Sequence, residues 1–432
     1  MLKVLKRFCF FIVEYVCSLR WIFKDYSIIE QVILLKKGGK KFFCNYIIVR
    51  NNYKRVQSIL KKEKGHRKIR VCFLVSESSK WNMQSLYDEL LKSDVFYPFI
   101  VVTNLTRYLE HRPSYQRLLG FYQGVANNVE VGWDECTKKG LDLERFSPDM
   151  VFYQQPWELF ENQNVKRVSS FALTFYCSYA IEDAYGVAKA HLRDFYSLLT
   201  RYFVFSDTYK DYFQKNCPYT LSNISAVSGH PKLDVYTDYH PQDYKHKYVI
   251  YAPHHAFEKN SLRYGTFPWS GQFILNWAKS HPEIDWVFKP HPRMKIALIE
   301  GGIMNSEEAE HYYDEWRKIG IAYEDGNYFG LFLESKCLIT DCGSFLTEYL
   351  PTQMPVIQLC NEDSKEFTPT TIKIIDSYYK AFDTFELHNL LEDVVLKKND
   401  TLKNKRLEII RELGLNNNSG LRVVRELDKL LS

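Results

Sequence analysis

The sequence predicts an α/β protein built from two doubly wound, Rossmann-like domains that face each other across a cleft. Three observations support this prediction. The chain has 432 residues, more than a single growing hydrophobic core usually contains, so two domains are expected. Short apolar runs alternate with amphipathic segments over 69–227, and the same alternation begins again at residue 248. A polar stretch rich in turn-forming residues, 228–247, separates the two series.

The first domain is preceded by a basic, amphipathic segment, 1–66. Apolar residues recur at helical spacing from Phe8 to Ile22, and Lys and Arg residues crowd 36–41 and 61–70. Glu14 and Arg20 interrupt the apolar stretch, which argues against a signal peptide or a membrane span. Two interpretations remain: an amphipathic helix in the cytoplasmic membrane interface, or a helix packed on the domain core.

The first domain is expected over 67–235. A turn signal, Ser147-Pro148-Asp149, precedes one of its strands, and Ser206 is placed to cap one of its helices. We predict strands at 69–75, 97–102, 150–153, 168–175, 202–205 and 224–227. Helices are predicted at 82–91, 106–119, 191–200 and 207–214.

The second domain, 236–384, repeats this architecture. Strands are predicted at 248–252, 285–289, 336–340 and 356–359, and helices at 271–280, 307–319, 328–334 and 344–349. A mostly helical tail, 385–432, follows. Because two α/β domains joined by a short linker form a cleft, the ligand site is expected between them.

Composition excludes several classes of protein. The ten cysteines form no C-x-x-C pair, which favours reduced thiols in a cytoplasmic protein over a zinc finger or a disulfide framework. No P-loop, G-x-G-x-x-G or H-E-x-x-H motif is present, which argues against P-loop NTPases, ordinary NAD enzymes and metalloproteases and favours chemistry without metal or cofactor. Basic residues cluster near the N-terminus instead of alternating with aromatic residues around the cleft, so nucleic acid is not the expected partner.

Lys289, His291 and Arg293 lie in a loop that follows an apolar strand. Two prolines alternate with them, and proline fixes φ, so the three side chains are presented in a narrow range of geometries. Cations and an imidazole held in this way suit a phosphate-bearing substrate. A surface loop without function is the alternative.

The junction Thr340-Asp341-Cys342-Gly343-Ser344 joins another apolar strand to a helix. Glycine allows close approach of a ligand, and the free N–H groups at the start of a helix favour an anion. The candidate substrate-binding residues here are Gly343, Ser344, Phe345, Thr347 and Glu348. The alternative is structural, with Ser344 as an N-cap and the others as ordinary residues of the first turns.

Three further histidines are candidates. His254 and His255 follow the strand at 248–252, and histidine can serve as base, acid or cationic clamp near neutral pH. His230 lies in the interdomain segment, where it either contacts substrate or belongs to a structural turn. We expect His254, His255 and His291 to be catalytic and His230 to bind substrate.

At these residues the chain resembles the CDP-glycerol:poly(glycerophosphate) glycerophosphotransferase family, which builds teichoic-acid-like and capsular polymers in bacteria. The resemblance spans roughly 150–359, and its closest matches are Gly229 to Asp234, the Lys-Pro-His-Pro loop and the Thr-Asp-Cys-Gly-Ser junction. It implies a GT-B fold in which the second domain holds a cytidine diphosphate-linked donor and the first domain, 67–235, faces the acceptor. It also implies donor phosphates held by His291 and Ser344, with Gly343 at the mouth of the helix.

The chain departs from the family at one position that matters for catalysis. The family carries a His-Gly-x-Pro segment whose histidine is thought to act as base, whereas the matching stretch here is Tyr153-Gln154-Gln155-Pro156-Trp157. His255 or His254 is therefore the first choice for the base, followed by Glu182 or Asp183.

These observations predict a transferase that moves an alditol phosphate, such as glycerol phosphate, from a CDP-linked donor to a hydroxyl of a bacterial cell-surface or capsular glycan and releases CMP. The expected partners are the CDP-linked donor and a glycan or lipid-linked acceptor. We expect it on the inner face of the cytoplasmic membrane. One alternative is a GT-B glycosyltransferase that uses a nucleotide-activated sugar. Another is a catalytically degenerate module that binds glycan or partner proteins.

Overall fold

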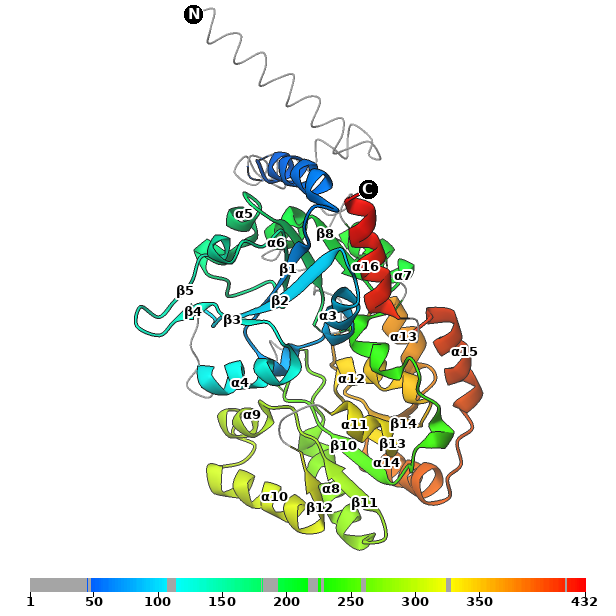
Figure 1. Cartoon of the computed structure of the whole chain (residues 1–432). Helices are drawn as coiled ribbons and strands as arrows, with labels where there is room; N and C mark the ends of the chain where they lie inside the picture. The colour runs from blue at the N-terminus through cyan, green and yellow to red at the C-terminus, as the bar shows by residue number, and fades with distance from the viewer. Residues whose placement is uncertain are drawn as a thin grey trace, which may run out of the picture.

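Two parallel β-sheets, one above the other in Figure 1, organise the chain. The computed structural model describes residues 45, 48–106, 114–179, 181, 193–216, 224–226, 229–257, 262–323, 328–415 and 418–432. The predicted amphipathic stretch from Phe8 to Ile22 and the basic run 36–41 lie outside these residues. Within the described ranges, no helix combines the length and the hydropathy needed to cross a membrane.

The first sheet contains seven of the described strands in the order β3-β2-β1-β6-β7-β8-β9, all of them parallel. Their bounds are β1 Ile69–Val75, β2 Phe96–Val102, β3 Val129–Val131, β6 Met150–Tyr153, β7 Leu173–Cys177, β8 Arg201–Val204 and β9 Ile224–Ala226. The chain moves outward from β1 to β3 and then returns to the other side of β1 at β6. This reversal is a topological switch point, outside which open α/β sheets bind ligands.

Helices cover this sheet: α3 Gln84–Leu91, α4 Tyr115–Val125, α5 Val165–Val168, α6 Arg193–Leu198 and α7 Asp207–Asn216. A further helix, 48–63, buries Val49, Tyr53, Val56 and Leu60 in the same core. Part of the basic cluster is used internally, because Lys64 pairs with Asp428 at 2.8 Å.

The prediction for 168–175 is wrong at its start. Val165–Val168 forms α5, and β7 begins only at Leu173. Valines fit either element, but the Asn164 side chain accepts a hydrogen bond from the Arg167 N–H at 2.9 Å, and this N-cap stabilises the helix. The helix predicted at 106–119 begins at Tyr115 and continues to Val125, while 107–113 lie outside the described residues.

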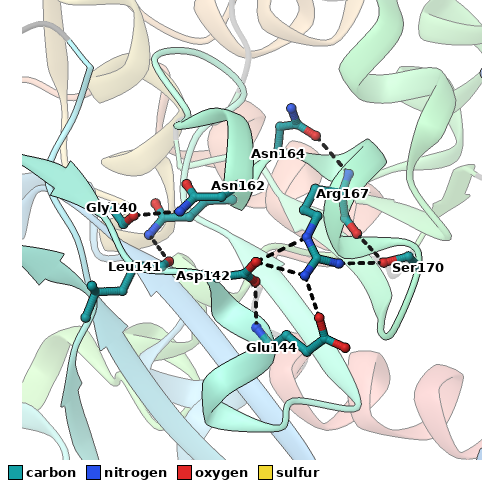
Figure 2. Close-up of polar contacts among 9 residues, drawn as sticks. Gly140, Leu141, Asp142, Glu144, Asn162, Asn164, Arg167 and Ser170 are labelled. Carbon is teal, nitrogen blue, oxygen red and sulfur yellow. Dashed lines mark hydrogen bonds and ion pairs between the residues drawn. The ribbon is translucent and has the colours of Figure 1, made fainter.

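Arg167 of α5 holds together the segment that leads into β6 (Figure 2). Its guanidinium donates to Asp142 at 2.8 Å and to Glu144, while Asn162 donates to the Gly140 carbonyl at 2.7 Å. Gly140 belongs to a short antiparallel hairpin, β4 Trp133–Asp134 with β5 Lys139–Gly140, which was not predicted from the sequence.

The second sheet has the order β12-β11-β10-β13-β14-β15 and is also parallel. Its strands are β10 Tyr248–Ala252, β11 Asp285–Phe288, β12 Gly320–Ala322, β13 Ser335–Thr340, β14 Val356–Leu359 and β15 Tyr379–Ala381. Its switch point lies between β10 and β13, where the predicted strands 248–252 and 336–340 lie side by side. Its helices are α8 Phe267–Ser280, α9 Met294–Glu300, α10 Ser306–Ile319, α11 Phe329–Leu333, α12 Gly343–Glu348, α13 Pro369–Ile375 and α14 Thr384–Leu390.

The C-terminal tail is helical, as predicted, and it returns to the first sheet. A π-helical turn, Leu391–Leu396, continues α14, and α15 Lys403–Leu413 and α16 Ser419–Leu430 follow. In Figure 1, α16 lies beside α3. The Asp234 carboxylate accepts from the main-chain N–H groups of Ser419 and Gly420 at 2.7 Å each, and from the Ser85 hydroxyl at 2.7 Å. The tail therefore fastens the interdomain segment to the first sheet.

Candidate functional site

Three loops meet at the carboxyl end of the second sheet, beside its switch point. The loop after β11 joins the loop after β10 through the His291 N–H, which donates to the Pro253 carbonyl at 3.0 Å. The loop after β13 joins the same β10 loop through Asp341, whose Oδ1 accepts from the His254 N–H at 2.6 Å. The three segments singled out in the sequence therefore form one site.

His254, His255 and His291 form a compact cluster in this site. The His255 and His291 rings stack with centroids 3.9 Å apart and planes inclined by 28°. The His254 ring lies 4.5 Å from that of His255 and 5.2 Å from that of His291. The structure therefore brings the three predicted catalytic residues together, while their catalytic role stays a prediction.

Main-chain hydrogen bonds fix the tautomer of two of the three rings. The His254 Nδ1 accepts from the Ala256 N–H at 3.2 Å, and the His291 Nδ1 accepts from the Arg293 N–H at 3.1 Å. Because a neutral imidazole carries one proton, both rings hold it on Nε2. His254 and His291 are consequently hydrogen-bond donors at Nε2, which suits an anion.

The third ring is not fixed in this way. The His255 Nδ1 is buried and has no hydrogen-bond partner among the described residues. A tautomer with the proton on Nδ1 would leave a lone pair on Nε2, the form that a general base requires. His255 is thus the member of the cluster that can act as a base.

Burial keeps all three imidazoles neutral. Desolvation lowers the pKa of His254 to about 3 and, assisted by the Arg293 charge, lowers the pKa of His255 to about 4. The pKa of His291 falls well below its usual range, mainly by burial and then by its histidine neighbours, Lys289 and Arg293. At neutral pH the cluster therefore offers N–H groups and lone pairs and carries no charge of its own.

Asp341 connects the loops and was not singled out as a site residue. Its Oδ1 accepts from His254, and its Oδ2 accepts from the Thr266 N–H at 2.6 Å and from the Thr266 hydroxyl at 2.8 Å. Burial raises the pKa of Asp341 to about 6. Since both oxygens are occupied, Asp341 positions the His254 loop and the start of α8.

The mouth of α12 is built from Cys342, Gly343 and Ser344. Cys342 is the N-cap residue and its side chain makes no capping hydrogen bond, so Ser344 is not the cap. The Thr340 hydroxyl orders the turn by accepting from the Cys342 N–H at 3.0 Å and donating to the Ala252 carbonyl at 2.6 Å. Gly343 is buried and Ser344 is half-buried.

The other predicted residues of α12 face packed neighbours. Phe345 packs against Tyr328, with ring centroids 4.8 Å apart, and Thr347 is fully buried. Glu348 is fully buried and pairs with Lys232 of the interdomain segment at 2.7 Å, while the Tyr328 hydroxyl donates to its other oxygen. Glu348 therefore ties α12 to the interdomain segment.

The two cations of the proline-braced loop differ in exposure. Lys289 is only 5% exposed, and its ammonium lies 5.7 Å from the centroid of the Tyr328 ring. Arg293 is exposed at the start of α9. Both follow β11 directly, so positive charge lies next to the histidine cluster.

His230 has both ring nitrogens engaged by the main chain. Its Nδ1 accepts from the Lys232 N–H at 3.1 Å, and its Nε2 donates to the Ser178 carbonyl at 2.7 Å. Burial lowers the pKa of His230 to about 3. These contacts give His230 a positioning role in the interdomain segment, beside the Lys232 that pairs with Glu348.

The first domain offers no base at the position where the resembling family has histidine. Tyr153 is fully buried, and its hydroxyl donates to the Gln163 carbonyl at 2.9 Å. Gln154 is also buried and holds the loop after β1 through the Ser76 and Glu77 N–H groups at 2.8 and 3.0 Å. The alternative bases Glu182 and Asp183 lie outside the described residues.

The histidine cluster also has the composition of a metal site, since ligand atoms of the three residues lie within 4.8 Å of one another. A metal needs a nitrogen lone pair. The Nδ1 lone pairs of His254 and His291 already accept main-chain N–H groups, so their Nε2 atoms carry protons. The donor set therefore fits an anion better than a cation.

Comparisons with known proteins bear on the fold. No protein-family model and no curated protein sequence matches the chain. Among solved structures, UDP-GlcNAc 2-epimerase from Neisseria meningitidis bound to UDP-GlcNAc is similar, with a TM-score of 0.55 and 14% identity over 84% of this chain and 100% of that one.

A second solved structure is the H444N variant of the wall teichoic acid polymerase TagF. It has a TM-score of 0.51 and 13% identity over 91% of this chain and 98% of that one. Both neighbours have two α/β domains in the GT-B arrangement. The chain has the GT-B fold. This confirms the fold class that the sequence predicts, and at these identities the comparisons carry the fold alone.

Proposed function

We propose that this GT-B protein is a transferase that moves an alditol phosphate from a CDP-linked donor to a hydroxyl of a bacterial cell-surface glycan. The observation that carries the proposal is the pair of Nε2 donors on His254 and His291, fixed by main-chain hydrogen bonds at the switch point of the second sheet. Donors held in advance of the reaction stabilise negative charge without a cost of reorganisation.

The charge balance of the site supports a diphosphate. Lys289 and Arg293 are cationic, whereas the two acidic residues of the β13 loop and α12 are already engaged. Asp341 accepts from Thr266 and His254, and Glu348 pairs with Lys232. The positive groups beside the histidine cluster therefore meet no competing carboxylate from these two residues.

In the proposed reaction, the acceptor oxygen attacks the phosphorus that carries the alditol. A new phosphorus–oxygen bond forms, the bond to CMP breaks, and CMP leaves with the electron pair. His255 accepts the hydroxyl proton, since it is the ring whose tautomer the main chain leaves open. The Nε2–H groups of His254 and His291, with Ser344 at the mouth of α12, stabilise the negative charge on the leaving phosphate by hydrogen bonding.

The decisive experiment measures CMP release from CDP-glycerol and CDP-ribitol in the presence of a membrane fraction that supplies acceptor. The variants are His291→Ala and Ser344→Ala, with the exposed His388→Ala on α14 as a matched control. We expect a 100- to 1,000-fold loss of rate in the first two, because removal of one oxyanion donor has about this effect. Unchanged rates in both would contradict the phosphate assignment.

A glycosyltransferase that uses a nucleotide-activated sugar is the second candidate. It is favoured by Tyr153, which stands where the family that the chain resembles has its histidine base. Tyr153 is fully buried and its hydroxyl is hydrogen-bonded, so it cannot serve as that base. The same loops would grip the diphosphate in either reaction. The products separate the two, since alditol-phosphate transfer releases CMP and glycosyl transfer releases a nucleoside diphosphate.

The site of action proposed here is the inner face of the cytoplasmic membrane. Because Lys64 is paired internally, this proposal depends on the basic and apolar residues of 1–44. Sedimentation with vesicles of anionic and of neutral lipid tests it. Retention of a variant lacking 1–44 on the anionic vesicles would overturn this assignment.

A further inference from the structure

The first sheet has its own cluster of side chains at its own switch point. The loops after β1 and β6 leave adjacent strands there, and the loop after β7 lies next to them. They contribute Lys80, Trp157 and Tyr179, all of them partly exposed. None of these residues takes part in the phosphate site described above.

The two aromatic rings form a corner around the lysine. Trp157 and Tyr179 meet edge to face, with centroids 5.7 Å apart and planes at 84°. The Lys80 ammonium lies 5.1 Å from the centroid of each ring. Such an arrangement combines aromatic surface with polar groups at fixed positions, as small-molecule sites do.

The polar part of the cluster is electrically balanced. Lys80 pairs with Glu77 at 2.6 Å and donates to the Gln155 Oε1 at 2.8 Å. The Gln155 amide in turn donates to the Trp157 carbonyl at 3.1 Å, which holds the tryptophan loop. Because the Lys80 charge is matched by Glu77, this cluster favours hydroxyl groups over an anion, in contrast to the loop of Lys289 and Arg293.

The two clusters are connected through the interdomain segment. The Lys232 ammonium lies 3.5 Å from the Tyr179 carbonyl and 2.7 Å from the Glu348 carboxylate at the end of α12. One side chain therefore bridges the loop that presents Tyr179 and the helix whose mouth carries Ser344. The loop that presents Tyr179 and the helix at the proposed donor site are therefore joined by a single residue, Lys232.

We infer that Trp157, Tyr179 and Lys80 form an acceptor subsite for an uncharged pyranose ring, with the buried Gln155 positioning Lys80 and the tryptophan loop from behind. A pyranose presents a face of C–H bonds that packs on the negative face of an aromatic ring, and its hydroxyls can bond to the Lys80 ammonium and the Glu77 carboxylate beside it, both of which are partly exposed. An acyclic polyol phosphate offers neither the flat C–H face nor the neutrality. This inference deepens the proposed function and rests on it, because it states the chemical class of the acceptor residue that receives the phosphate.

Saturation-transfer NMR with small-molecule probes tests the subsite. The probes are the methyl glycosides of glucose, galactose and N-acetylglucosamine, with glycerol 1-phosphate and ribitol 5-phosphate as acyclic counterparts. We expect saturation of ring C–H protons in at least one glycoside and a roughly tenfold weaker Kd in Trp157→Ala, whereas Trp157→Phe, which keeps a ring, retains most of the affinity. Phe385→Ala, an exposed aromatic on α14, is the control.

The outcomes separate this inference from the proposed function. CDP affinity is measured on the same samples. If the protein without substitutions does not bind CDP, the proposed donor site is wrong. Three results, each obtained with normal CDP binding, would overturn the subsite. They are no signal from any glycoside, glycoside binding by Trp157→Ala that equals binding by the unsubstituted protein, and signals from the phosphopolyols alone. If Trp157→Ala fails to fold, Tyr179→Leu carries the same test with the same expected loss.

Discussion

The Nδ1 atom of His291 accepts a hydrogen bond from the main-chain N–H of Arg293 at 3.1 Å. The same contact, from a histidine to the N–H two residues later, joins His254 to Ala256 and His230 to Lys232. In each case the main chain holds the imidazole with its proton on Nε2. The Nε2–H of His230 donates to the Ser178 carbonyl, whereas those of His254 and His291 bond to no other described residue, which makes them available to a ligand.

The first prediction concerns these tautomers. In protein labelled with 15N-histidine, we expect His254 and His291 to show the neutral, Nε2-protonated pattern from pH 7.5 down to pH 5, because burial and the main-chain donors oppose a proton on Nδ1. The His254→Asn and His291→Asn variants assign the signals. Protonation of either ring with a midpoint near 6.5 would contradict the donor role.

A second prediction tests Asp341 as the residue that positions the loops. Asp341→Asn places an amide N–H₂ against a main-chain N–H of His254 or Thr266, so one buried donor loses its acceptor. We expect a loss of about 1–3 kcal/mol in the free energy of unfolding, measured by urea denaturation. Asp285→Asn, an exposed residue at the start of β11, is the matched control. An Asp341→Asn variant as stable as this control would show that the carboxylate does not hold the loops.

Much of the fold could be predicted because its strands are buried runs. The bounds of β10 and β14 coincide with the prediction, since apolar residues end abruptly there at polar or proline-containing flanks. The helix α5 was missed because Val165 and Val168 suit either element and the Asn164 cap decided between them. Short edge elements such as β12 and β15 were missed because three residues carry too little periodicity.

The site could be predicted only in part. Histidines after neighbouring parallel strands are expected to meet, and they do. The role of each nitrogen could not be predicted, because it depends on which main-chain N–H turns toward the ring. Asp341 contacts Thr266 and His254, which lie 75 and 87 residues earlier, and Lys232 lies 116 residues before Glu348. Contacts at such separations leave no local signal in a single sequence.

The third prediction concerns the tie between Lys232 and Glu348. The Glu348 side chain is fully buried and that of Lys232 is 9% exposed, so Lys232→Met leaves a buried carboxylate with the Tyr328 hydroxyl as its remaining hydrogen-bond partner among the described residues. We expect a destabilisation of about 3–5 kcal/mol. The double variant Lys232→Met/Glu348→Met should recover most of this loss, because it removes the buried charge. Calorimetry measures the stability of both variants. If the single and double variants are equally destabilised, the unpaired carboxylate is not the cause of the lost stability.

The fourth prediction is the dependence of stability on pH. The pKa of His230 and of His254 is lowered to about 3 and that of His255 to about 4, and His291 is also lowered, against about 6.5 for each in the unfolded chain. Between pH 6.5 and 4 the unfolded chain therefore binds more protons at these four residues than the folded chain does. The contribution of these four histidines to the free energy of unfolding is therefore present above pH 6.5 and is lost as the pH falls.

Asp341 acts in the opposite direction, since its folded pKa of about 6 lies above its unfolded value of 3.8. Its contribution is present below pH 3.8 and is lost as the pH rises through 6. One carboxyl opposes four imidazoles, so the net effect of these five groups is that acid destabilises the fold, by about 1.4 kcal/mol per pH unit for each net proton. Urea midpoints at pH 7.5, 6.5 and 5.5 measure it. In the double variant His254→Asn/His291→Asn, the free energy of unfolding should change less steeply with pH, because up to two fewer protons are taken up on unfolding. An unchanged slope would mean that these rings are not held neutral by burial.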